Sequence, residues 1–281
     1  MHWHPRFRSW LATLLLASSL VGGAADAHEA LAEARYLANE AVLVAHGDTK
    51  VLFDAFYVDS FGSLALVPEK TGAAILAGTP PYDGIDAVFV SHAHGDHFTA
   101  APTLAYLRAH PAVRLFAPDQ VIRALTDTAD GPDDPVLRRL VRVDVKPGDA
   151  PLTTTIDGLT IDAIAVPHAG GERFANVRNV IFRVSLGDWP TIMHLGDAAP
   201  DLASFSAQKD FLDAKRTNTA LPPHWFANAD TGKTILEDWI KADQVIAIHI
   251  PADAAGQGTA WRAMLGSDAF TDPGEVRAIE R

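Results

Sequence analysis

Cysteine is absent from this sequence. Without a thiol, the chain can form no disulfide bond and offers no thiolate ligand to a metal ion. A lipoprotein anchor, which requires a cysteine at the cleavage site, is excluded as well. A metal site formed by these side chains would have to rely on imidazole and carboxylate ligands.

Positive charge is also scarce. The chain carries 23 Lys and Arg against 35 Asp and Glu, which gives a formal net charge of −12. An acidic exterior opposes binding to nucleic acids and to anionic lipids, because both carry phosphate charge. We therefore expect a small-molecule substrate and no nucleic-acid partner, while the oligomeric state stays open.

No apolar run reaches the length that a membrane span requires. The strongest run, Trp10–Val21, is shorter than the roughly 20 residues of a transmembrane helix. Arg6 and Arg8 precede it, and small residues follow it up to Ala25-Asp26-Ala27. This order is typical of a secretory signal peptide with an A-x-A cleavage site, so we predict a signal peptide over residues 1–27.

The predicted cleavage leaves a mature chain from residue 28 to residue 281. We find no internal repeat, low-complexity stretch or linker in it, so we expect a single domain. The expected location is the periplasm or the exterior, with no stable membrane anchor after cleavage. An uncleaved N-terminal anchor is the alternative.

The most informative stretch begins with an apolar run over residues 87–90, which is typical of a buried strand. Directly after it, four side chains that can ligate a metal stand within six positions: His92, His94, Asp96 and His97. His92 and His94 project to the same side of an extended chain, and Gly95 then permits a sharp turn. One short loop is thereby predicted to serve two metal ions. Imidazole and carboxylate ligands suit zinc, iron, manganese or nickel.

The motif His92-Ala-His94-Gly-Asp96-His97 resembles the His-x-His-x-Asp-His signature of the metallo-β-lactamase superfamily. Members of that family add a third histidine, an aspartate after a glycine and a last histidine, each just beyond a strand. Candidates for these positions follow three apolar runs in the expected order: His168, Asp197 and His249. The resemblance extends from about Arg35 to Pro251.

The resemblance implies a layered α/β fold, a four-layer αββα sandwich with metal ions at one edge of two facing sheets. It assigns His92, His94 and His168 to a first metal and Asp197 to a bridge between the two metals. The second metal would be held by three residues: Asp96, His97 and His249. Two divalent ions are thus implied, with zinc as the default.

The implied activity is hydrolysis by a hydroxide that bridges the two metals, oriented by Asp96. Relatives that hydrolyse β-lactams generally lack the bridging aspartate, so Asp197 favours an ester, lactone, thioester or phosphodiester as the substrate. His224 follows two prolines and precedes two aromatic residues, and it is a candidate for contact with substrate or for proton donation. An iron-dependent oxidoreductase and a non-catalytic metal-binding protein are the alternatives.

Four further residues have an open role. Asp54 lies in an apolar strand and either orients a ligand imidazole or faces solvent. His194 is predicted to be a packed structural residue, because on a strand it faces away from Asp197. Arg178 and Asn179 are weaker candidates for contact with an anionic substrate.

Specificity in this fold is expected in three loops over the metals, which are residues 57–63, 169–179 and 221–230.

Overall fold

The computed structural model describes residues 1–2 and 31–281, and the elements below all belong to the unit Leu31–Arg281. The predicted signal peptide and its cleavage site fall outside the described residues, apart from Met1 and His2. Among the helices of the described part, none combines the length and the apolar character that a membrane crossing needs.

Two seven-stranded sheets form the centre of the unit. The first contains β1 (Ala32–Ala38), β2 (Ala41–His46), β3 (Thr49–Phe53), β4 (Ala87–Phe89), β5 (Arg114–Ala117), β6 (Leu140–Arg142) and β14 (Val276–Ile279). The second contains β7 (Leu152–Ile156), β8 (Leu159–Val166), β9 (Asn179–Leu186), β10 (Thr191–His194), β11 (Thr219–Leu221), β12 (Gln244–Ala247) and β13 (Asp268–Ala269). The strand orders are β14-β1-β2-β3-β4-β5-β6 and β13-β12-β11-β10-β9-β8-β7. Both sheets mix antiparallel hairpins with parallel strands, such as β3–β4–β5 and β10–β11–β12.

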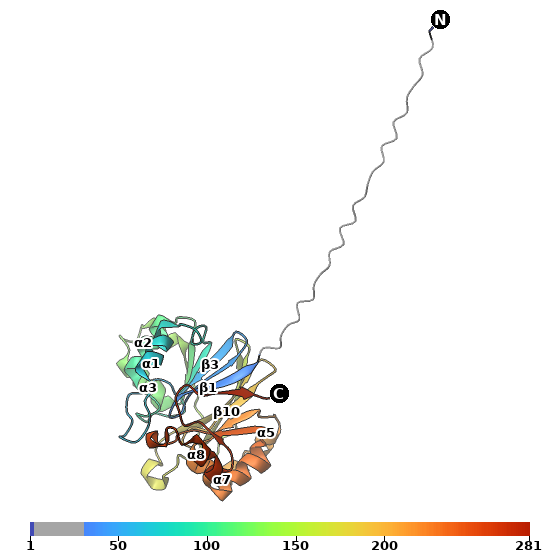
Figure 1. Cartoon of the computed structure of the whole chain (residues 1–281). Helices are drawn as coiled ribbons and strands as arrows, with labels where there is room; N and C mark the ends of the chain where they lie inside the picture. The colour runs from blue at the N-terminus through green and yellow to red at the C-terminus, as the bar shows by residue number, and fades with distance from the viewer. Residues whose placement is uncertain (3–30) are drawn as a thin grey trace. The chain divides into compact units, whose positions relative to one another are not determined.

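Helices cover the outer face of each sheet (Figure 1). Beside the first sheet lie α1 (Glu69–Ala77), α2 (Ala100–Ala109), α3 (Asp119–Thr128) and the 3₁₀ helix η1 (Pro135–Arg139). Beside the second lie α4 (Leu202–Ser206), α5 (Lys209–Asp213), α6 (His224–Asn228), α7 (Asp230–Thr234), the π-helix η3 (Ile235–Ile240) and α8 (Gly258–Leu265). Short 3₁₀ turns, η2 (Gly171–Phe174) and η4 (Ala252–Ala254), lie in loops. The predicted αββα sandwich is confirmed.

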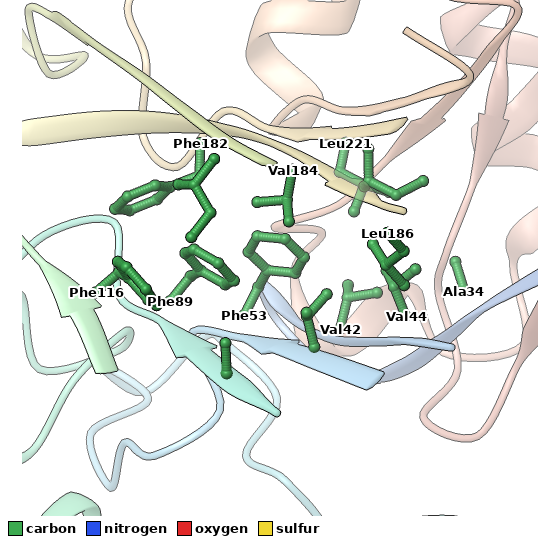
Figure 2. Packing of buried hydrophobic residues seen from close by; sticks show 14 of the residues in the cluster. Ala34, Val42, Val44, Phe53, Phe89, Phe116, Phe182, Val184, Leu186 and Leu221 are labelled. Atoms are coloured by element: carbon green, nitrogen blue, oxygen red, sulfur yellow. The ribbon is translucent and has the colours of Figure 1, made fainter. Parts of the chain in front are cut away.

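The main apolar core lies between the two sheets. Phe53, Phe89 and Phe116 stack along the first sheet, with ring centroids 5.1 Å apart in each neighbouring pair. Phe182 of β9 meets Phe89 from the opposite sheet, also at 5.1 Å (Figure 2). Aromatic pairs at this spacing contribute about 0.5–1.5 kcal/mol each beyond the area that they bury. Separate apolar clusters lie between each sheet and its own helices, so the inner strands are buried on both faces.

The sequence pattern predicts bounds for several elements that differ in the structure. The run over residues 40–45 predicts a strand that includes Glu40, but Glu40 lies in the turn between β1 and β2. The β character of residues 136–145 predicts a strand, but part of this stretch is the 3₁₀ helix η1. Helical patterns over 201–215 and 231–241 predict two helices, and each of them is divided in two. The apolar run over residues 244–250 predicts a strand of that length. It ends at Ala247, and β13 and β14 follow it in the chain.

The sheet edge at the carboxyl ends of β4, β8, β10 and β12 collects the predicted ligands. The histidine motif follows β4, His168 follows β8, Asp197 follows β10, and His249 follows β12. Loops at the carboxyl ends of strands are where α/β sheets commonly bind their ligands. The fold therefore brings together residues that are more than 150 positions apart in the sequence.

Candidate metal centre

The loop after β4 is held in shape by its own backbone. The amides of His97 and Phe98 both donate to the carbonyl of His94, at 3.1 and 2.9 Å. The turn that was expected at Gly95 is present, although the φ of Gly95 is not in the left-handed region. The lack of a side chain has a further effect, since a Cβ at this position would lie 3.1 Å from the Cβ of Asp59. The glycine thus permits the loop over residues 57–63 to approach the motif.

One group of ligand atoms comes from His92, His94, His168 and Asp197, and these atoms lie within 4.8 Å of one another. The Nε2 of His92 is 3.1 Å from the Nδ1 of His94. The Nε2 of His168 is 3.1 Å from Oδ2 of Asp197, and that of His92 is 3.8 Å from the same oxygen. Apart from the partly exposed His94, these residues are buried.

A second group consists of Asp96, His97 and His249, all of them buried. Oδ2 of Asp96 lies 3.4 Å from the Nε2 of His97 and 3.2 Å from the Nε2 of His249. The Oδ1 atom of Asp197 reaches the same two imidazoles, at 3.3 and 3.4 Å. Asp197 therefore places one carboxylate oxygen in each group.

The donor set fits divalent cations. Three buried atoms in it have no hydrogen-bond partner among the described residues: Nε2 of His97, Nε2 of His168 and Oδ1 of Asp197. Buried polar atoms without a partner are costly, and a cation placed between these lone pairs would remove that cost. The nitrogen and oxygen donors suit zinc and iron alike.

The charges of His92 and Asp197 also suit metal binding, whereas His97 would have to release a proton before it could ligate a cation. Burial opposes a positive charge on His97, but the neighbouring carboxylates of Asp197, Asp54 and Asp96 outweigh burial and raise its pKa well above the usual range. Burial, and then the neighbouring charge of His97, hold the pKa of His92 well below its usual range, so this imidazole stays neutral. Burial works against the negative charge of Asp197, but His97 and His249 outweigh it and keep the pKa of that carboxyl well below normal. Neutral imidazole and ionised carboxylate are the forms that ligate metals.

Comparison with known proteins agrees with this geometry. The sequence profile of the family described as "Beta-lactamase superfamily domain" matches residues 49–250. This chain belongs to the metallo-β-lactamase superfamily. No curated protein sequence matches it.

Solved structures share the fold of this superfamily member at low sequence identity. A possible metal-dependent hydrolase from Veillonella parvula has a TM-score of 0.59 at 13% identity, with 89% of this chain and 100% of that chain covered. The metallo hydrolase Igni18 from Ignicoccus hospitalis has a TM-score of 0.57 at 15% identity, with 89% and 99% covered. CmlA, a diiron β-hydroxylase from Streptomyces venezuelae, has a TM-score of 0.50 at 15% identity, with 90% of this chain and 54% of CmlA covered.

Asp54 lies behind the second group and is only 1% exposed, so the solvent-facing alternative is wrong. Its Oδ2 accepts a hydrogen bond from Nδ1 of His97 at 2.8 Å. Ser91 donates both its amide, at 2.8 Å, and its hydroxyl, at 2.5 Å, to the same carboxylate. With its Nδ1 proton held in this way, His97 directs the lone pair of Nε2 into the metal centre.

Sequence reasoning missed the roles of two residues near the centre. Asn179 is buried, accepts from the amide of Asp197 at 3.0 Å and donates to the carbonyl of Leu195 at 3.1 Å. It therefore orients Asp197, and because Asn179 is only 1% exposed, its expected contact with an anionic substrate is wrong. Glu40 is fully buried, with Oε2 3.7 Å from Nδ1 of His97. Burial raises the pKa of Glu40 well above its usual range. An acidic residue within an apolar run was the signal for Glu40, and Asn179 gave none.

His194 occupies the structural role that was predicted for it. It is fully buried, and its ring stacks on Phe53 with the centroids 5.0 Å apart. Its Nε2 donates to the backbone carbonyl of Glu40 at 3.0 Å, and its Nδ1 accepts from the amide of Gly196 at 3.3 Å. Because both ring nitrogens are engaged in these hydrogen bonds, His194 belongs to neither of the two groups of ligand atoms.

His224 starts α6 beside the second group. Its Nδ1 donates to the carbonyl oxygen of His249 at 2.6 Å, and its ring meets Trp225 and Trp261 edge-on. Trp225 packs against the apolar cluster between the second sheet and its helices. Its ring also contacts that of His249, with centroids 4.7 Å apart, while its Nε1 donates to the carbonyl of Ala198.

His224 and Trp225 belong to the predicted specificity loop over residues 221–230, and the other two predicted loops border the ligands as well. In the loop over residues 169–179, the ring of Phe174 lies 4.9 Å from the imidazole centroids of His94 and His168. In the loop over residues 57–63, the amide of Asp59 donates to the carbonyl of Gly95 at 3.2 Å.

Proposed function

We propose that this superfamily member is a hydrolase that uses two divalent cations. The observation that carries the proposal is the position of Asp197, which offers one oxygen to each group of ligand atoms. A site for one structural ion would need no second set of donors. Zinc is the first choice, because it accepts imidazole and carboxylate ligands and needs no redox control.

Two divalent cations, when bound, would lower the pKa of a shared water toward neutrality and stabilise the negative charge that develops on the bond under attack. The carboxylate of Asp96 lies between the Nε2 atoms of His97 and His249. We assign it the additional role of accepting a hydrogen bond from the attacking water, which orients that water toward the substrate.

His224 is assigned to proton transfer. Its Nδ1 proton is committed to the carbonyl of His249, so Nε2 is the atom that can take or give a proton. Burial lowers the pKa of His224, which keeps the imidazole neutral near pH 7 and able to accept a proton first. It would then release that proton to the leaving group.

The substrate is proposed to carry an ester, lactone, thioester or phosphodiester bond and to have an apolar part. The presence of a bridging aspartate supports this choice of bonds over a β-lactam. Apolar side chains border the centre, since Phe174 packs on the ligand imidazoles and Phe61 is 61% exposed in the loop beside the motif.

We also propose that the protein works in the periplasm or outside the cell. This proposal depends on the signal-like sequence over residues 1–27. N-terminal sequencing of the protein recovered from the periplasmic fraction of an expressing bacterium would test it, with His28 as the expected first residue.

The test of the main proposal is a hydrolysis panel run on zinc-loaded protein. It contains a chromogenic ester, a lactone, a thioester, bis-p-nitrophenyl phosphate and nitrocefin. We expect turnover of one of the first four classes, lost when a chelator removes the metal and restored when zinc is returned. An inert panel with fully loaded protein would contradict the proposal.

An iron-dependent oxidoreductase is the second candidate. The donor set accepts iron as readily as zinc, and the fold is shared with a diiron β-hydroxylase. Iron as the dominant metal in protein from its native host, combined with oxygen uptake and no hydrolysis, would favour this candidate.

A further inference from the structure

A polar cleft of about 510 Å³ lies at the carboxyl ends of β5 and β6. It opens between the first half of α3, the end of β6 with the chain that follows it, and the loop that precedes β9. Four cationic side chains line it, and they come from these three segments: Arg123, Arg142, Lys146 and Arg178. The lining includes two acidic residues, Asp119 and Asp144, so the cleft carries a formal excess of two positive charges in a chain of net charge −12.

The positive charge in the cleft is only partly neutralised. Asp119 pairs with Arg123 at 2.7 Å and also with Arg142. The side chains of Lys146 and Arg178 form no ion pair or hydrogen bond with any other residue that the structure describes. Two cations that face a polar cavity without a partner are available to a negatively charged ligand.

The wall of the cleft that carries Arg178 is rigid. Oε1 of Gln120 accepts from the amide of Arg178 at 2.8 Å, and Nε2 of Gln120 donates to the carbonyl of Asn176 at 2.8 Å. Both ends of this short segment are thereby tied to α3. A guanidinium on a fixed backbone loses less conformational entropy on binding an anion than one on a mobile loop.

The same segment joins the cleft to the metal centre. Asn179, directly after Arg178, holds the amide of Asp197. Phe174, four residues before Arg178, packs on two ligand imidazoles. Four residues span at most about 14 Å, so the Cα atoms of Phe174 and Arg178 lie within that distance. The metal centre and the cleft are therefore connected by one short segment, and we expect a substrate of medium size to contact both.

We propose that this cleft binds an oxyanion of the substrate, a carboxylate or phosphate group remote from the bond that is cleaved. Arg178 provides the planar, two-pronged donor that suits both groups, and Lys146 adds a second positive charge. The identification of the ligand as substrate depends on the proposed hydrolase function, whereas the binding of an oxyanion does not.

The kinetic test compares two p-nitrophenyl esters, the neutral butyrate and the anionic hydrogen glutarate. For the double variant Arg178→Gln/Lys146→Gln, we expect KM for the glutarate ester to rise about tenfold or more, with kinetics on the butyrate unchanged. Arg138→Gln is the control for a single lost charge, because this exposed arginine lies outside the cleft. Equal effects on the two esters, or no effect on either, would overturn the proposal.

A binding test separates the cleft from catalysis. Inorganic phosphate is titrated calorimetrically into the zinc-loaded wild type, the double variant and Arg138→Gln. We expect the double variant alone to lose the binding event that the other two share, even if no ester in the panel is hydrolysed. Unchanged phosphate binding in the double variant would show that the anion goes to the metal centre or elsewhere, and the cleft would then have no such role.

Discussion

The strands β8 and β9 carry two buried charged clusters of opposite character. In the middle of the hairpin, Asp162 and Arg183 face each other in register and pair at 3.0 Å. At the end of the same hairpin lie His168 and Asn179, which belong to the metal centre. Comparing the two clusters shows how a structural ion pair differs from a ligand site.

The Asp162–Arg183 cluster satisfies all of its own hydrogen bonds. Arg183 also donates to three backbone carbonyls around α5, and Asp162 accepts from Thr153 and from Lys215, each at 2.8 Å. No side-chain atom of either residue is among the buried atoms without a partner. At the metal centre, by contrast, imidazole nitrogens and a carboxylate oxygen that face one another have no hydrogen-bond partner among the described residues. A buried charged cluster whose hydrogen bonds are all satisfied indicates a structural role, whereas one that keeps unpaired donor atoms indicates a ligand site.

The largest effect is expected from Asp197→Ala, which removes a donor from both groups. Metal content should fall below two ions per chain. Catalytic efficiency should fall by more than the roughly 10–100-fold that loss of an outer partner costs. Elemental mass spectrometry and kinetics on the best substrate measure both. Asp188→Ala, which changes an exposed aspartate, is the control and should behave like the wild type. Full activity in Asp197→Ala would contradict the assignment.

Arg183→Met should lower the stability of the fold and leave metal binding unchanged, in contrast to Asp197→Ala. It leaves the buried Asp162 with Lys215 as its only cation, and unfolding free energy should drop by about 3–5 kcal/mol. The metal content of the folded protein should not change. Urea denaturation provides the measurement. The double variant Asp162→Leu/Arg183→Met, which removes both buried charges, should recover much of the loss. A loss of metal in Arg183→Met would mean that the two clusters are not independent.

Asp54→Asn should distinguish the two cation sites of the metal centre from each other. Because Asp54 holds Nδ1 of His97, the substitution should weaken the second cation by about 10–100-fold and the first much less. Competition with a chromophoric chelator measures the two affinities. An equal weakening of both cations, or none, would show that the contact between Asp54 and His97 does not select the second site.

The smallest of the expected effects is a loss of stability at the Asp162–Arg183 cluster when the pH is lowered. Burial alone would raise the pKa of Asp162, but the hydrogen bonds from Lys215 and Thr153, together with the charge of Arg183, outweigh burial and lower it. A lowered folded-state pKa stabilises the protein above the unfolded-state value near 3.8, and this contribution disappears as the pH falls through the folded-state pKa. In metal-free protein, the stability difference between wild type and Asp162→Asn should therefore shrink between pH 6 and pH 3. A stability difference that stays constant over this pH range would contradict the lowered pKa of Asp162.

The sequence was informative where a residue type is rare and its position is tied to a strand end. All seven predicted ligands come from this signal, because histidine and aspartate directly after apolar runs have few structural explanations, and their side chains do lie together in the structure. The turn Asp157-Gly158 between two runs of β character likewise predicts the β7–β8 hairpin, whose strands have the expected bounds.

The parts that were missed depend on contacts between distant segments. Asn179 has its role only because the fold brings the amide of Asp197 to its side chain. A glycine is needed at position 95 because Asp59 approaches it closely. Short strands at sheet edges gave no pattern of their own. β13 has two residues and β14 has four, and both depend on pairing with strands elsewhere in the chain.

The most direct test of the account is a crystal structure of the zinc-loaded protein with anomalous diffraction measured at the zinc edge. We predict two peaks on either side of Asp197, one near Oδ2 and ringed by His92, His94 and His168, the other near Oδ1 beside His97 and His249. A single peak, or two peaks that do not share Asp197, would contradict the central claim.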